Sequence, residues 1–441
     1  MSSDAAARHS AEPARRPNFF IVFCDDLGFG DVSIYGGGDI HTPVIEEMAK
    51  AGVTLTNYYA AANICTPSRV GLLTGRYPIR TGLGYEVIMQ DDDRGLPLSE
   101  VTIAAALKPE YTTGLFGKWH LGHRQPYWPP TKYGFDEFFG IPYSHDMKPL
   151  SLFEAHAGSE AVHETPVDFN RLQQDFYDHA ERFIENNRDR PFFVLLSLSA
   201  PHLPNCPPDK YEHTSGRGSY GDVVREIDDI VARLRAKLRQ LELEDNTLVI
   251  FTSDNGPWFE GSTGGLRDRK GGAAYDGGYH VPFVAQMPGL LPKGTTVDSI
   301  VMAIDLLPTI CKLAGKSTPE RLLDGQDIGE VLKAGAATPH EELVLFDNEA
   351  VVGIRTQRWK YLDVAYYRGL RMPLSRMGYD QLYDLCADPG ENYSVAADYP
   401  EVLADMRERI RRAREQFEPF RSKTIPAVFT RLKKLFEHSQ D

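Results

Sequence analysis

Three short apolar runs, each followed by a polar cluster, constrain the fold of this chain more than any other feature. Runs of this length that are apolar on both faces are typical of strands covered by helices on both sides of a sheet. In such sheets, ligands bind at the carboxyl ends of the strands. We therefore expect the three polar clusters to meet at one site. The runs and their clusters are 18–24 with Asp25-Asp26, 191–199 with Ala200-Pro201-His202, and 247–252 with Ser253-Asp254-Asn255.

Helical patterns lie between these runs. From Val223 to Leu241, apolar residues recur every three or four positions, which predicts an amphipathic helix. Alternating strands and helices indicate an α/β fold with a large, mixed but mostly parallel sheet between helices. Beyond residue 330 the pattern changes to short strands in hairpins, at 342–346, 351–362 and 383–385, followed by a helix over 399–417. We predict a flexible N-terminus over 1–16, a main domain over 17–330, and a smaller subdomain with a tail over 331–441.

The composition excludes several classes of function. A net charge of −14 over 441 residues argues against nucleic acid and against an acidic membrane surface as partners. The five cysteines form no CxxC pair and do not indicate a disulfide framework. No run of 18 apolar residues is present, so no membrane span is expected. The first 17 residues hold no apolar run of signal-peptide length, which predicts a soluble, cytoplasmic protein.

The pentapeptide Cys65-Thr66-Pro67-Ser68-Arg69 comes before a short predicted helix. Pro67 suits the first helical position, Thr66 can cap it, and Gly75 would end it. Cys65 would then face free backbone N–H groups, with Arg69 one turn on, which favours an anion. A lone cysteine in this place is more often a small buried hydrophobe, so its meaning depends on its neighbours.

Oxygen ligands gather at two of the predicted strand ends. Asp25 and Asp26 would repel each other unless a cation lay between them, although they could also simply cap the turn that follows. Asp254 and Asn255 add a carboxylate and an amide oxygen. A set of oxygen donors without thiolate or imidazole suits a hard divalent cation such as Ca²⁺ or Mg²⁺.

Cationic and imidazole side chains accompany these oxygens. Lys118 and His120 are two residues apart in a segment, 114–122, that we expect to be extended, which would point both side chains to one face. His202 lies between prolines, and Lys270 lies in a glycine-rich loop. Each signal is weak alone. Together with the metal donors and a nucleophile, they are the groups needed to transfer a tetrahedral oxyanion.

At this point the chain resembles the sulfatases of the alkaline-phosphatase-like superfamily, whose signature is similar to residues 65–69. The similarity spans about residues 17 to 395 and implies an alkaline-phosphatase-like fold and hydrolysis of an aryl or carbohydrate sulfate ester. The block at 140–146 is most similar to the branch of arylsulfatase A and N-acetylgalactosamine-6-sulfatase. Further matching blocks lie at 25–31, 74–76, 117–122, 254–256, 382–385 and 388–392.

The resemblance also implies roles for single residues. In the family, a formylglycine-generating enzyme oxidises the signature cysteine to Cα-formylglycine, whose hydrate attacks sulfur with one hydroxyl and releases sulfate with the help of the other. His120 would assist that release, and His202 or Lys270 would assist the leaving oxygen. The other implied roles are one Ca²⁺ held by Asp25, Asp26, Asp254 and Asn255 beside Cys65, formylglycine stabilised by Arg69 and Lys118, and sulfate contacted by Ser144, Lys118, His202 and Lys270.

Some alternatives stay open. Asp276-Gly277-Gly278-Tyr279-His280 stands where the family usually has Glu-Gly-Gly-x-Arg, which leaves the specificity for the leaving group undetermined. A formylglycine-dependent phosphonate monoester or phosphodiester hydrolase is the nearest rival. Asn255, where two-metal phosphatases of the superfamily typically have histidine, favours one metal and sulfate. A rival of another class is an inactive anion- or sugar-binding protein on the same scaffold. The sequence gives neither the alcohol part of the substrate nor the oligomeric state.

Overall fold

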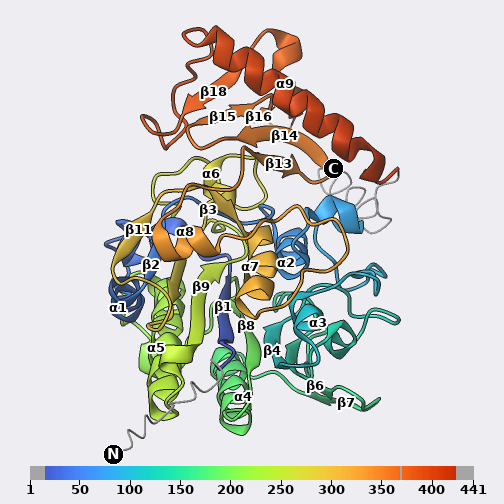
Figure 1. The fold of residues 1–441 in the computed structure, drawn as a ribbon, viewed down its shortest axis with the longest axis vertical. Helices are drawn as coiled ribbons and strands as arrows, with labels where there is room; N and C mark the ends of the chain where they lie inside the picture. The colour runs from blue at the N-terminus through green and yellow to red at the C-terminus, as the bar shows by residue number, and fades with distance from the viewer. Residues whose placement is uncertain (1–14, 368–369, 424–441) are drawn as a thin grey trace, which may run out of the picture.

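The computed structural model describes residues 15–367 and 370–423 (Figure 1). Most of the predicted flexible segment 1–16, and the tail from residue 424, lie outside the described residues. The described chain forms a ten-stranded sheet flanked by helices, with a four-stranded antiparallel sheet and a long helix stacked at one end (Figure 1). The predicted α/β fold, with a large mixed sheet and a smaller antiparallel sheet, is confirmed.

The three apolar runs form neighbouring strands at the centre of the large sheet. Its five central strands, β9, β1, β8, β4 and β5, are all parallel, and antiparallel pairings appear only toward its two sides. In order across the sheet, the strands are β11 (Thr295–Val297), β2 (Val53–Leu55), β10 (Phe283–Gln286), β9 (Thr247–Ser253), β1 (Asn18–Asp25), β8 (Phe192–Pro201), β4 (Thr112–Lys118), β5 (Glu137–Ile141), β6 (Leu152–His156) and β7 (Val162–Thr165).

Helices cover both faces of this sheet, which explains why its central strands are apolar throughout. All residues of β1, β8 and β9 are buried, and alternate residues of β1 join two different hydrophobic clusters. One cluster includes α1 (Pro43–Ala51), α4 (Leu172–Asn186) and α5 (Gly218–Gln240); the other includes α2 (Cys65–Thr74), α3 (Ile103–Leu107), α6 (Asp276–Tyr279), α7 (Leu306–Leu313) and α8 (Gly329–Ala334).

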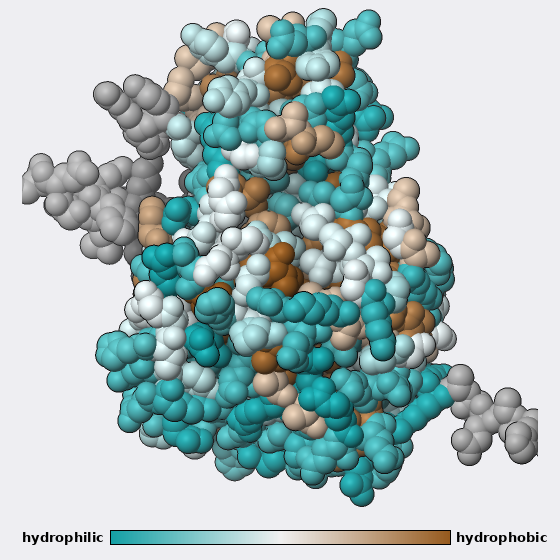
Figure 2. All heavy atoms as spheres, turned by 90° about the vertical axis from the view of Figure 1, so that its left-hand side faces the viewer, coloured by the Kyte–Doolittle hydropathy of each residue, from teal (hydrophilic) through white to brown (hydrophobic). Residues whose placement is uncertain are grey.

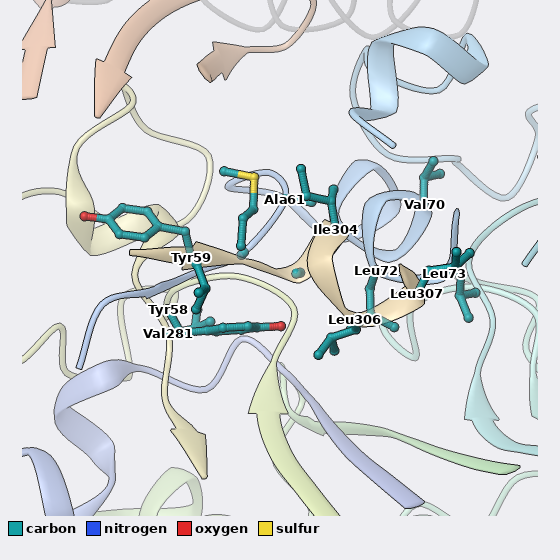
Figure 3. Close-up of a cluster of buried hydrophobic side chains, with 14 of the residues drawn as sticks. Tyr58, Tyr59, Ala61, Val70, Leu72, Leu73, Val281, Ile304, Leu306 and Leu307 are labelled. Carbon is teal, nitrogen blue, oxygen red and sulfur yellow. The ribbon is translucent and has the colours of Figure 1, made fainter. Parts of the chain in front are cut away.

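Helix α2 lies deep in the second cluster. All ten of its residues are buried, and its leucines lie beside those of α7 (Figure 3). Gly71 permits this close packing, because a Cβ there would lie 2.2 Å from the Cβ of Ala61. The helix is therefore held by side chains on all sides and presents no face to solvent.

The smaller sheet packs against the long C-terminal helix, α9 (Pro400–Phe417), which contacts β14 and β15. A buried ion network joins this part to helix α6, because Lys360 Nζ lies 2.6 Å from Asp276 on α6 and 2.8 Å from Glu391. The predicted boundary at residue 330 falls inside α8 and stays a prediction. The strands are β13 (Leu343–Asp347), β14 (Ala350–Arg355), β15 (Trp359–Leu362) and β18 (Gln381–Asp384), with a hairpin of β16 (Val364–Tyr367) and β17 (Leu370–Pro373) and a separate pair of β3 (Tyr58–Tyr59) and β12 (Val301–Met302).

The exterior is mostly polar. The face shown in Figure 2 carries hydrophilic side chains over most of its area, with small hydrophobic patches between them. Of the helices in the described part of the chain, none has both the length and the apolar character needed to cross a lipid bilayer.

Glu226 gives the fold a testable dependence on pH. This carboxyl of α5 is buried, its side chain accepts a hydrogen bond from Gln174 Nε2 at 2.7 Å, and burial raises its pKa from 4.5 to about 7. Between these two pH values the folded state binds more protons than the unfolded state, so stability falls as pH rises. At about 1.4 kcal/mol per pKa unit, a rise from 4.5 to about 7 corresponds to a loss of roughly 3 kcal/mol.

We expect Glu226→Gln to remove this loss, because the amide resembles the protonated acid and still offers an oxygen to Gln174. Thermal unfolding at pH 5 and pH 8 should show a gain in Tm over the wild type that is larger at pH 8. The same change at exposed Glu212 serves as the control. An equal effect of Glu226→Gln at both pH values would contradict the prediction.

Candidate active site

The strand ends meet as predicted. Cys24 of β1 pairs with Ser253 of β9, and Asp25 pairs with Pro201 of β8. The backbone N–H of Asp26 donates to Asp254 Oδ1 at 3.1 Å. The polar clusters that follow these three central strands therefore converge at the carboxyl edge of the sheet.

The convergence produces a cluster with the chemistry of a metal site. Ligand atoms of Asp25, Asp26, Asp254 and Cys65 lie within 4.8 Å of one another, and all four residues are buried. Asn255 Nδ2 donates to Asp26 Oδ1 at 2.7 Å, while the buried Asn255 Oδ1 has no partner among the described residues. Three carboxylates and one unsatisfied amide oxygen are the donor set of a hard divalent cation, so the residues fit the predicted Ca²⁺.

The carboxylates repel one another in this site. Burial and the neighbouring Asp25 raise the pKa of Asp254 to about 7. Burial alone would also raise the pKa of Asp25, but Lys118 and Arg69 hold it well below its usual value. A bound cation would relieve the repulsion, which is a physical reason for so many acids at one place.

Three basic side chains compensate these acids. Lys118 Nζ lies 2.6 Å from Asp25 Oδ2, and Arg69 Nη2 lies 2.7 Å from Asp254 Oδ2. Burial alone would lower the pKa of Lys270, but the carboxylate of Asp26, 2.6 Å from its Nζ, holds it well above its usual value. The three carboxylates and three cations balance. Any added divalent cation therefore creates a positive site, which an anionic substrate can occupy.

Helix α2 begins two residues earlier than the sequence predicted. Its first residue is Cys65, with Ile64 at the N-cap, so the prediction that Thr66 caps the helix is wrong. The Thr66 hydroxyl instead donates to the backbone oxygen of His120 and accepts from Ile88 N, both at 3.0 Å. A tertiary contact has replaced the local cap. The predicted end at Gly75 is confirmed, with φ at 67°.

Burial disfavours the thiolate form of Cys65. Its side chain is buried, with Sγ 3.4 Å from Asp25 Oδ1, and burial raises its pKa well above the usual value. The thiolate, which is the nucleophilic form of cysteine, is therefore disfavoured.

Of the segment 114–122 predicted to be extended, the part up to Lys118 belongs to strand β4, and the prediction is wrong for the residues that follow it. The strand ends at Lys118, and His120 has a φ of 59°. Burial and the charge of Lys118 hold the pKa of His120 well below its usual value. Because a carbonyl can only accept, the bond of 2.9 Å between His120 Nε2 and Ile88 O places the proton on Nε2. Nδ1 then carries no proton, and it is buried without a hydrogen-bond partner among the residues that the structure describes.

The remaining predicted residues lie against the acidic cluster. Ser144 Oγ is 3.2 Å from Lys118 Nζ and 3.3 Å from His202 Nε2. His202 Nε2 is 3.7 Å from Asp26 Oδ2. The structure thus joins all the predicted residues through direct contacts, except that His120 is joined through its backbone contact with Thr66.

Sequence reasoning missed several polar residues. Ser197 of β8 accepts from Arg69 Nη1 at 2.7 Å and donates to Lys118 O at 2.7 Å, which fixes two of the cations. Ser199, on the same strand, bonds to His145. Two serines inside an otherwise apolar run were the available signal.

The unusual segment 276–280 faces a different part of the molecule. Asp276 accepts from Tyr59 Oη at 2.9 Å and pairs with Lys360. The ring of His280 stacks on Tyr59 with centroids 5.3 Å apart. Asp276 thus takes part in the contact with the C-terminal sheet through Lys360 of β15. His280 packs instead on Tyr59 of β3.

Comparisons with known proteins agree with this geometry. Residues 17–316 match the model of the sulfatase family, and residues 270–416 match the model of the C-terminal region of N-sulphoglucosamine sulphohydrolase. Human arylsulfatase A is 34% identical, with 90% of this chain and 87% of that protein covered. The PsFucS1 sulfatase from Pseudoalteromonas sp. superposes with a TM-score of 0.85 at 26% identity, covering 93% and 92% of the two chains. Ps i-CgsB, solved in complex with k-i-k-neocarrahexaose, gives a TM-score of 0.79 at 27% identity, covering 94% of each chain.

Proposed function

Because the chain belongs to the sulfatase family and is a sulfuric ester hydrolase, we propose that it acts on an aryl or carbohydrate sulfate with one Ca²⁺ and a Cα-formylglycine made from Cys65. The observation that carries the proposal is the buried cluster of Asp25, Asp26, Asp254 and Cys65, beside the unpartnered Asn255 Oδ1. The oligosaccharide in the similar Ps i-CgsB structure supports a carbohydrate as the alcohol part.

The acidic cluster would hold the cation through the carboxylates and the free amide oxygen of Asn255. When present, Ca²⁺ polarises an oxygen of the ester and formylglycine supplies the hydroxyl nucleophile. Arg69 and Ser197 keep the cluster in shape, since Arg69 bonds Asp254 and Ser197 at 2.7 Å each. His120 offers the bare, buried Nδ1 as an acceptor for a proton from residue 65.

We use the term sulfate recess for the place between the side chains that would contact the sulfate, which are those of Lys118, Ser144, His202 and Lys270. The two ammonium groups already touch Asp25 and Asp26, so they can turn part of their hydrogen bonding to a sulfuryl oxygen that arrives beside the cation. His202 Nδ1 bonds the carbonyl of Leu203 at 2.7 Å, which leaves Nε2 facing the recess. Protonated His202 Nε2, or Lys270 Nζ, can donate a proton to the leaving alcohol oxygen.

Turnover of an aryl sulfate and of an aryl phosphonate, compared on protein in which residue 65 is confirmed as modified, tests the proposal. We expect kcat/KM to favour the sulfate by at least about tenfold, because a pocket shaped and charged for one ester discriminates by about 1.4 kcal/mol or more. A strong preference for the phosphonate would support the rival phosphonate hydrolase. No turnover of either ester by modified protein would support the inactive binding protein.

Removal of the metal gives a second test. A chelator should abolish turnover of the aryl sulfate, because three buried carboxylates would then face the anionic ester with only their own cations as compensation. Added Ca²⁺ should restore the rate. Full activity after exhaustive chelation, verified by elemental analysis, would contradict a role for the cation.

A further inference from the structure

A line of buried polar side chains lies behind His202, within a largely apolar layer. It consists of Gln173 on α4, Ser199 on β8 and His145 after β5, with relative exposures of 6%, 0% and 3%. Buried polar groups are costly unless their hydrogen bonds are satisfied. Here the bonds lead from one residue to the next and end on the backbone oxygen of His202.

The direction of each hydrogen bond follows from donor and acceptor chemistry. The backbone N–H of Ser199 can only donate, so the group 3.1 Å away is the oxygen of the Gln173 amide. The Gln173 amide nitrogen therefore donates to Ser199 Oγ at 2.9 Å. The Ser199 hydroxyl keeps its own proton for His145 Nδ1, which lies 2.9 Å away.

This series of hydrogen bonds determines the tautomer of His145. Because Nδ1 accepts from Ser199, the ring proton is on Nε2, and it donates to the backbone oxygen of His202 at 2.8 Å. Burial, together with the charge of His202, lowers the pKa of His145 to about 4, so the ring is neutral near pH 7. The amide of Gln173, acting through Ser199, thus helps to decide which ring nitrogen of His145 carries the proton.

The same bond positions His202. Its backbone oxygen is held by His145, and its Nδ1 is held by the next carbonyl, that of Leu203, at 2.7 Å. The rings of His145 and His202 meet edge to face, with centroids 5.6 Å apart. With the backbone and one ring nitrogen fixed, Nε2 of His202 is left 3.3 Å from Ser144 Oγ.

We propose that His145, oriented by Ser199 and Gln173, is a positioning residue that holds His202 Nε2 at the sulfate recess through the bond from its Nε2–H to the His202 carbonyl. The inference rests on the proposed function, since it needs His202 to contact the ester. His145 does not itself touch the acidic cluster in any contact described above. Loss of its bond frees the loop that carries His202, and a small displacement of a reacting group lowers the rate about 10²-fold.

Two substitutions of His145 separate positioning from packing. In His145→Gln, the side-chain nitrogen reaches about as far as Nε2 and can still donate to the His202 carbonyl. In His145→Asn, the amide ends near the position of Nδ1, so it keeps Ser199 and loses His202. We expect His145→Asn to lower kcat on an aryl sulfate by about 10-fold to 10²-fold with a smaller change in KM, and His145→Gln to retain most of the wild-type kcat.

A spectroscopic measurement accompanies the kinetics. The ¹⁵N resonances of labelled imidazole should show His145 as the Nε2–H tautomer in the wild type. Ser199→Ala removes the donor to Nδ1 but keeps the His202 carbonyl, which can accept only from Nε2–H. We therefore expect the Nδ1 resonance of His145 to shift in this variant while Nε2 keeps its proton, and we expect Ser199→Ala to fold even if an amide at position 145 does not. An Nδ1–H tautomer in the wild type would overturn the inference.

The outcomes also distinguish the inference from the proposed function. Wild-type kcat in His145→Asn, or equal losses in His145→Asn and His145→Gln at equal Tm, overturns the inference alone. No turnover of any sulfate ester by the wild type, or full activity of His202→Ala, overturns the proposed roles and the inference with them. A lower kcat in His145→Asn, together with a kcat close to that of the wild type in His145→Gln, supports the inference.

Discussion

Cys65→Ala is expected to abolish turnover of sulfate esters while the protein stays folded. The side chain of Cys65 is buried, with Sγ 3.4 Å from Asp25 Oδ1, and burial raises the pKa of the thiol. Alanine at this position has no group that can attack sulfur. Loss of the nucleophile should lower kcat by about 10⁴-fold or more. The methyl group of alanine fits the space, because it removes one atom from a well-packed site. Turnover of an aryl sulfate and thermal unfolding together measure the two effects.

Cys311→Ala is the matched control, since Cys311 is equally buried but lies on α7, in the hydrophobic cluster and not among the site residues. Cys311→Ala should lower the Tm without a comparable loss of kcat. Peptide mass spectrometry must show the modification in the active wild type and in the control. Retained turnover in Cys65→Ala would exclude residue 65 as the nucleophile.

Lys118→Ala is expected to lower kcat/KM by at least about 10²-fold, the usual cost of removing one preorganised charge from an active site. Its ammonium group is fully buried and lies 2.6 Å from Asp25 and 3.2 Å from Ser144, so it serves both the metal site and the sulfate recess. The loss should appear in kcat and KM, because both the bound ester and the reacting ester carry negative charge. Initial rates across a range of aryl sulfate concentrations measure it.

The same change should destabilise the fold. It leaves the buried Asp25 with Arg69 at 3.3 Å as its remaining partner in an ion pair, and breaking a buried pair costs about 3 to 5 kcal/mol. Saturating Ca²⁺ should recover part of the lost Tm. Lys50→Ala is a suitable control, because that lysine side chain is 77% exposed. Wild-type kcat/KM in Lys118→Ala would remove the residue from the mechanism.

The centre of the fold and the position of the site could be predicted from short segments. A strand that is apolar on both faces must lie inside a covered sheet, and the polar residues that follow β1, β8 and β9 must then share one edge. Local information was insufficient where a distant group decides the conformation. Thr66 has the chemistry of a cap, yet its hydroxyl serves the carbonyl of His120, which is 54 residues away.

The hydrogen-bonded residues behind His202 could not be predicted from local sequence for the same reason. Gln173, Ser199 and His145 come from three separate parts of the chain, and each has an ordinary neighbourhood in the sequence. Their roles depend on which atom donates to which, and this is defined only once α4, β8 and the loop after β5 are packed together. The predicted roles of the metal-site and sulfate-contacting residues stay predictions until the substitutions above are made.

The complete burial of α2 has a consequence for how the protein is made. All ten residues of the helix are enclosed, and a modifying enzyme would need Cys65 in an accessible, extended segment. The proposed conversion of Cys65 would therefore have to precede folding, and a molecule that folds first would keep its thiol. Two molecules with the same sequence, the same shape and the same Tm can then differ completely in activity. The specific activity of a preparation would then measure the fraction of molecules in which modification preceded folding.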